Sequence, residues 1–145
     1  MKLEDIFKNW EQDSIIERTQ LDNEVLKITM LHHKYFKIYT NEKMVYRKLE
    51  AEFKQLKLEK YEFYTQGPTK EQHERGWVLP PQGKILKAEV NQYIEADKQI
   101  IDISLKIGIQ LEKIELLESI IKSLQNRGYN IKTALEYIKF QMGNY

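Results

Sequence analysis

Residues 100–124 read IIDISLKIGIQLEKIELLESIIKSL. Isoleucine and leucine recur in this stretch at intervals of three and four residues, which is the heptad spacing of a helix that packs along one seam. The seam consists of Ile100, Ile103, Ile107, Ile114, Leu117, Ile121 and Leu124, with Gln110 as its polar member. A second apolar line consists of Ile101, Leu105, Ile109, Leu116 and Ile120. The doubled surface predicts an all-α fold in which this helix contacts more than one neighbour, and we expect the seam residues to hold a homo-oligomer.

The helical pattern extends beyond this stretch in both directions. It begins near Lys84 and allows a break around Ala96-Asp97. We expect it to end at Asn126-Arg127-Gly128, because glycine suits the left-handed position that follows many helices. A last short helix is predicted from about Ile131 to Phe140, folded back onto the long one.

The N-terminal part also has helical spacing. A short amphipathic helix is predicted from the apolar residues Leu3, Ile6, Phe7 and Trp10. Thr19 or Asp22 can cap the next helix. Its expected buried side consists of Val25, Ile28, Tyr35 and Ile38. The sequence leaves open whether this helix continues through Thr40-Asn41 or whether a second helix begins there and runs to about Thr65.

Residues 66–83 separate the two helical parts. They contain all three prolines and three of the six glycines, which predicts a long, helix-free connection. Trp77 in this segment either pins the loop to the body or contacts another molecule, and pinning is the favoured interpretation. We therefore divide one folded unit into an N-terminal helical region (1–66), a loop (67–83) and a C-terminal helical oligomerisation region (84–145).

Positive charge is concentrated in one part of the N-terminal region. The net charge of the chain is only +1, but residues 27–60 contain nine basic and four acidic residues. On a helix, the basic and aromatic residues of this part fall on one flank: Lys43, Arg47, Lys54, Lys57, Tyr61 and Tyr64. Apolar residues including Phe63 gather on another flank. Cations for phosphates and rings for unstacked bases are typical of a single-stranded nucleic-acid surface, although an ordinary solvated helix face looks similar.

Other classes of function find little support. There is no phosphate-binding Gly-Lys-Ser/Thr loop, no cysteine and no pair of carboxylates beside a nucleophile, so we expect neither an enzyme nor a cofactor. His32 and His33 are adjacent and point about 100° apart on a helix, which does not suit a shared metal ion. No apolar run is long enough to span a bilayer and no signal peptide is apparent, so we expect a soluble intracellular protein without a membrane partner.

Several segments, taken in order, resemble a known family. They are residues 1–6, 30–39, 49–51, 61–65 and 121–132, the last of which reads IKSLQNRGYNIK. Together they are similar to the UvsY recombination mediators of T4-like bacteriophages. None of these segments is a diagnostic motif, and the resemblance rests on their ordered combination along nearly the whole chain.

The resemblance implies an all-helical protein that forms a ring-like homo-oligomer and binds single-stranded DNA in the cytoplasm of the infected host cell. Its implied partners are the phage recombinase and the phage single-strand-binding protein, because the family helps to load the first onto strands coated by the second. The family's DNA-binding motif falls on Lys57, Lys60, Phe63 and Tyr64, with Leu58 in place of one lysine, so we expect residues 1–66 to be the DNA-binding region. The alternative is a coiled-coil adaptor that acts through protein contacts only.

Overall fold

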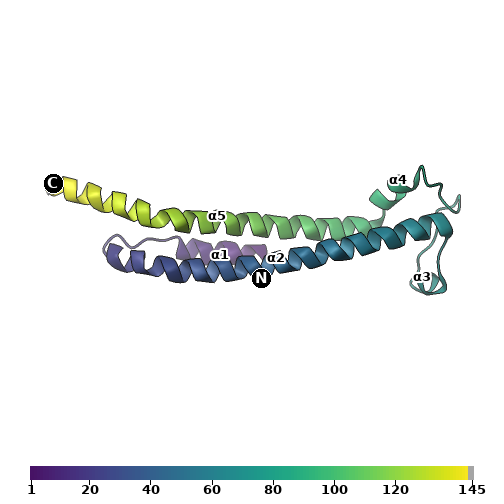
Figure 1. The fold of residues 1–145 in the computed structure, drawn as a ribbon, viewed down its shortest axis with the longest axis horizontal. Coiled ribbons are helices and arrows are strands. Elements are labelled where there is room, and N and C mark those ends of the chain that lie inside the picture. Colours follow the sequence, from purple (N-terminus) through teal and green to yellow (C-terminus); the bar gives the residue numbers. More distant parts are fainter. Residues whose placement is uncertain (144–145) are drawn as a thin grey trace. The chain divides into compact units, whose positions relative to one another are not determined.

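The computed structural model describes residues 1–143. In this part of the chain the regular elements are helices: α1 (Leu3–Asp13), α2 (Leu21–Gln66), α3 (Lys70–Glu74), α4 (Val90–Glu95) and α5 (Lys98–Gln141) (Figure 1). The predicted all-α class is therefore confirmed. No helix within the described residues combines the length and apolarity that crossing a membrane requires.

The helices form two compact units, and α2 and α5 contribute to both. The first unit contains residues 1–44 and 109–145, and the second contains residues 45–108. Because α2 is one helix of 46 residues, the open question at Thr40-Asn41 is answered: the helix continues through it. The break expected around Ala96-Asp97 is present, between α4 and α5.

The core of the first unit forms where α1 packs on α2 and α5. Tyr35 and Ile6 are fully buried, and the ring of Trp10 meets that of Tyr35 edge-on at a centroid distance of 5.6 Å. The rest of this core consists of Leu31, Leu117, Ile120, Ile121 and Leu124. The predicted buried side of α2 is partly wrong: Val25 is 44% exposed, whereas Leu31, which was not predicted, is buried in the core.

A buried polar contact joins the two long helices in this unit. The side-chain amide of Gln110 donates to the backbone oxygen of Glu42 at 2.8 Å and also to its carboxylate. Lys113 lies 3.8 Å from the same carboxylate. Gln110 therefore interrupts the isoleucine seam with a side chain that hydrogen-bonds to α2, and it adds to the partners that the buried carboxylate of Glu42 finds in Lys113 and the N-terminal ammonium.

The core of the second unit is built largely from the segment between α2 and α5. Phe63, Trp77 and Ile85 are buried in it, and the N–H of Ile85 donates to the carbonyl of Tyr64 at 2.8 Å. Trp77 thus pins the loop, as expected. The segment is not helix-free, however, because Thr69 and Gln72 form a reciprocal capping box that starts α3.

Two glycines end helices in this unit. Gly67, with φ of 92°, follows α2 and donates to the carbonyl of Phe63 at 2.9 Å, and Gly76, with φ of 85°, follows α3. Helical structure after the loop begins at Val90, later than the predicted start near Lys84.

The predicted end of the long helix at Gly128 is wrong. Helix α5 continues to Gln141, so the separate, folded-back helix from Ile131 to Phe140 does not exist. The helical turn at Gly128 is fixed from the side by Arg127. Its guanidinium donates to the carbonyls of Asp13 and Ile15 at 2.7 and 3.0 Å and lies 3.3 Å from the carboxylate of Glu24. This tertiary network outweighs the weak helix propensity of one glycine.

Gly128→Ala should raise the free energy of unfolding by about 0.5–1 kcal/mol, because glycine inside a helix is less favourable than alanine by that amount. An added Cβ would meet the Ile28 side chain at 3.8 Å, an ordinary contact distance. Urea unfolding measures the change. Gly67→Ala is the matched control and should destabilise, because its φ is positive. A destabilised Gly128→Ala variant would contradict a continuous helix at this position.

Candidate nucleic-acid interface

Three residues of the predicted basic stripe are exposed cations of the second unit. Arg47, Lys54 and Lys57 lie on α2 and are all exposed. Among residues 1–143, no carboxylate forms an ion pair with any of these three side chains. Their charge is therefore available to an external anion.

Lys54 and Lys57 also line a groove of the second unit. The groove has a volume of about 440 Å³, and α2 contributes Glu50 and Phe53 to its lining in addition to the two lysines. Helix α5 contributes Ser104 and Ile107. The groove thus combines an apolar floor with two cations, a combination that the helical stripe alone did not predict.

Lys43 and Tyr61 occupy intermediate positions. Lys43 belongs to the first unit, where its ammonium lies 5.2 Å from the centre of the Tyr39 ring. Tyr61 is half-buried and packs against the core of the second unit. Both side chains are partly exposed, but each also contacts other residues of the protein.

Lys60 and Tyr64 lie in the interior, and the expectation that Tyr64 projects from the exposed basic flank is wrong. Lys60 is 4% and Tyr64 9% exposed. The ammonium of Lys60 lies 3.1 Å from the carboxylate of Asp97, and the hydroxyl of Tyr64 donates to the same carboxylate at 2.6 Å. The second oxygen of Asp97 accepts from the backbone N–H groups at the start of α5.

Aromatic rings surround the buried ammonium. Lys60 lies 3.7 Å from the centre of the Trp77 ring and 5.6 Å from that of Phe63. The guanidinium of Arg75 also lies over Trp77, at 4.6 Å, and pairs with Glu59 at 2.6 Å. Phe63 is 2% exposed, which confirms its predicted place on the apolar side. These contacts give the end of α2 a structural role.

The electrostatics of Asp97 reflect this environment. Burial alone would raise the pKa of its carboxyl, but hydrogen bonds from Tyr64, Lys60 and the backbone of Ile100 outweigh burial and lower the pKa below 3.8. Burial and the neighbouring carboxylate together raise the pKa of Tyr64 well above its ordinary value. Asp97 is therefore ionised and Tyr64 is a neutral hydrogen-bond donor near neutral pH.

The predicted oligomerisation residues lie mostly in the interior of their own chain. Ile100, Ile114, Leu117, Ile121 and Leu124 are buried, and Ile103 and Ile107 are half-buried. Ile101, Leu105 and Ile109 of the second line are exposed, as is Leu111, which belongs to neither line. The doubled apolar surface of this helix predicted contacts with several neighbours. Most of these contacts are formed within one chain.

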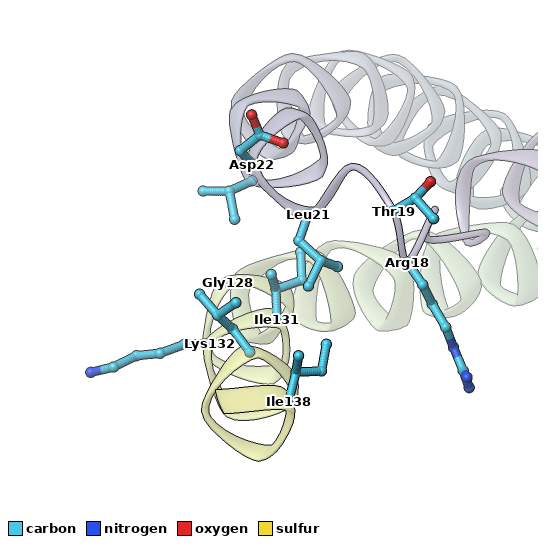
Figure 2. A pocket seen from close by; sticks show the side chains of 10 residues that line it. Arg18, Thr19, Leu21, Asp22, Gly128, Ile131, Lys132 and Ile138 are labelled. Atoms are coloured by element: carbon cyan, nitrogen blue, oxygen red, sulfur yellow. The ribbon is translucent and has the colours of Figure 1, made fainter. Parts of the chain in front are cut away.

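A second groove, which sequence reasoning missed, lies in the first unit near the C-terminal end of α5. It measures about 620 Å³, and its lining includes Leu21, Val25, Ile131, Leu135 and Ile138. Figure 2 shows Leu21, Ile131 and Ile138 directed toward one another, while the charged ends of Arg18 and Lys132 point away. The apolar spacing of Ile131, Leu135 and Ile138 is the signal for this groove in the sequence, but the same spacing also fits the separate helix predicted from Ile131 to Phe140.

No cluster of three or more potential metal-binding side chains of the His, Cys, Asp or Glu type occurs in the part of the chain that the structure describes.

The comparisons with known proteins agree with the fold. The sequence model of the family described as "Recombination, repair and ssDNA binding protein UvsY" matches residues 9–144. Two crystal structures of the bacteriophage T4 recombination mediator protein UvsY share 20% sequence identity with this chain, with TM-scores of 0.79 and 0.80. They cover 97% and 98% of this chain, which in turn covers 99% and 98% of theirs. No curated protein sequence matches the chain.

The family match extends over nearly the whole sequence and favours the recombination-mediator hypothesis over an adaptor without DNA binding. The chain belongs to the UvsY family of recombination mediators, non-enzymatic proteins that bind single-stranded DNA in recombination and repair.

Proposed function

We propose that this mediator binds single-stranded DNA through the exposed cations of its second unit, Arg47, Lys54 and Lys57. The observation that carries the proposal is that these side chains are exposed and have no carboxylate partner among the described residues. Phosphate binding then releases counterions without breaking an internal ion pair. Lys43 and Tyr61 can extend the contact, because both remain partly exposed.

Lys60 and Tyr64 act on DNA indirectly in this proposal. Both are held by Asp97, and Phe63 is buried beside them. Exposing Lys60 to a phosphate would leave the Asp97 carboxylate without its buried counter-ion, which is costly. We therefore assign these residues to the support of the helix end from which Lys54 and Lys57 project.

We further propose that the protein is a ring-like homo-oligomer held by the C-terminal end of α5. Leu135 and Ile138 are 40% and 37% exposed and line the apolar groove of the first unit. Tyr129, Tyr137 and Phe140 of the same helix are also exposed but do not line this groove, so the exposed apolar patch that α5 contributes to the groove consists of Leu135 and Ile138. An exposed apolar patch of this kind is typical of an interface, whereas most of the isoleucine seam is already buried within the chain.

Oligomerisation gives a mechanism to a mediator that has no ATP-binding motif. One subunit with a few exposed cations binds DNA weakly at physiological salt, but identical subunits in a ring bind one strand with high avidity. In the cytoplasm of an infected host cell, this binding would help to displace the phage single-strand-binding protein and to load the phage recombinase. The wrapped DNA and the protein contacts together would supply the free energy.

Replacing Lys54 and Lys57 together by Ala should weaken binding to single-stranded DNA. It should also flatten the dependence of log affinity on log salt by about 0.7 for each phosphate that the variant no longer neutralises. Fluorescence anisotropy of a labelled oligonucleotide at several salt concentrations measures both effects. The control removes two other exposed lysines, Lys8 and Lys122, and should change neither. An unchanged slope in a folded Lys54/Lys57 variant would place the DNA site elsewhere.

Leu135→Glu combined with Ile138→Glu should reduce the molecular mass measured by light scattering. The two charges would lie in the apolar groove of the first unit, and burying them against another copy of the chain is costly. Leu86→Glu with Val78→Glu is the matched control, since these residues are exposed apolar side chains of the second unit. If the Leu135/Ile138 variant keeps the wild-type mass, this groove is not the interface.

Asp97→Asn should lower the stability at pH 7 by about 3 kcal/mol, because it leaves the Lys60 charge buried without a counter-ion. It should also flatten the loss of stability in acid. The pKa of Asp97 is lowered on folding, so its contribution is fully present above pH 3.8 and is lost as the pH falls through the folded-state pKa. Urea unfolding between pH 7 and pH 3 tests this, with the exposed Asp102→Asn as control. Equal acid sensitivity in wild type and Asp97→Asn would be inconsistent with the buried network.

A further inference from the structure

The groove that Lys54 and Lys57 share with α5 has a composition that charge binding alone does not need. Its floor includes Phe53 and Ile107, both half-buried, and Ser104 stands on the α5 side. Exposed cations alone are enough to bind the phosphates of a DNA strand. An apolar floor between helices instead suits a flat, weakly polar group.

The core of the second unit holds the ring of Phe53 in place. Phe53 packs against the core cluster of the second unit and at the same time lines the groove. A ring fixed in this way loses little conformational freedom when a ligand stacks on it, and every nucleobase has a face that can stack on an aromatic ring.

The charged residues of the groove restrict where a DNA backbone can pass. Lys54 and Lys57 are three residues apart on α2, so they lie one helical turn from each other on the same side. Glu50 lines the same groove and repels phosphate. The backbone is therefore favoured along the two lysines, and the neutral base is the part of a nucleotide that can enter beside Phe53.

We propose that this groove is a nucleobase subsite, in which one base of single-stranded DNA stacks on Phe53 while the flanking phosphates contact Lys54 and Lys57. The inference rests on the proposed function, since it places one base at the site where that function places the backbone. The volume of about 440 Å³ lies within the range of about 300–1,000 Å³ that is usual for small-ligand pockets. Charge complementarity favours a nucleotide over an apolar protein segment as the occupant.

The test blocks the groove without changing any charge. Ser104 is exposed on α5, so Ser104→Trp fills the groove while the core is left intact. Ser119→Trp, at another exposed serine of the same helix, is the matched control. Each variant is titrated with an oligothymidylate and with an abasic oligonucleotide of the same length and charge, at several salt concentrations. Melting curves check that the variants are folded.

Wild type and Ser119→Trp should bind the oligothymidylate more tightly than the abasic strand. Ser104→Trp should remove this preference, with a loss of about tenfold for the oligothymidylate, within the range expected for one stacked base. Its affinity for the abasic strand and its salt slope should stay unchanged. If Ser104→Trp keeps the full preference for bases, the subsite proposal is wrong, while backbone binding by the lysines stands.

A second measurement needs no variant and therefore does not depend on the folding of Ser104→Trp. An oligonucleotide that carries 5-iododeoxyuridine is irradiated in complex with the wild-type protein, and the cross-linked peptide is identified by mass spectrometry. The proposal predicts a cross-link at Phe53. Cross-links confined to other aromatic residues, such as Tyr61, would overturn it. If wild type binds neither oligonucleotide, the proposed function fails and this inference fails with it.

Discussion

The carboxylate of Asp97 is the polar contact on which the second unit depends. It accepts the hydroxyl of Tyr64 and the ammonium of Lys60, both from the end of α2, and its other oxygen caps the start of α5 at the N–H groups of Gln99 and Ile100. One buried charge thus joins the end of α2 to the start of α5. Removing either Lys60 or Asp97 would leave the charge of the other buried without a counter-ion, and the second unit would be strongly destabilised.

The same contact decides which cations remain for DNA. Two residues that the family resemblance assigned to DNA binding, Lys60 and Tyr64, are occupied inside the protein, and Trp77 covers the ammonium. The neighbouring turn of α2 projects Lys54 and Lys57 outward, beside a groove whose floor is Phe53. The buried end of α2 therefore lies next to the turn that carries the exposed lysines, and it fixes the direction in which these lysines project.

Much of the fold could be predicted from the sequence, because the isoleucine seam has a period that only a helix satisfies. The errors arose where tertiary contacts outweigh local preference. Gly128 has the sequence of a helix end, but Arg127 beside it is tied to Asp13, Ile15 and Glu24, more than a hundred residues away in sequence. The seam was expected to meet other subunits. It lies largely inside the chain because α2, with its own apolar face, is long enough to cover it.

The candidate site could be predicted only in part. The periodicity of α2 placed Lys54 and Lys57 correctly on an exposed face and Phe63 on a buried one. It could not show that the loop after α2 folds back and buries Tyr64, because that contact depends on Trp77 and Asp97. Nor could it reveal the groove, since Ser104 and Ile107 come from α5.

The most direct test of this division of roles is lysine modification by an acetylating reagent, read by mass spectrometry with and without single-stranded DNA. In the free protein Lys54 and Lys57 should react readily and Lys60 slowly, because its ammonium is buried against Asp97 and Trp77. DNA should protect Lys54 and Lys57 and leave Lys60 unreactive. A Lys60 that reacts readily in the free protein and becomes protected by DNA, with Lys54 and Lys57 unaffected, would contradict the account.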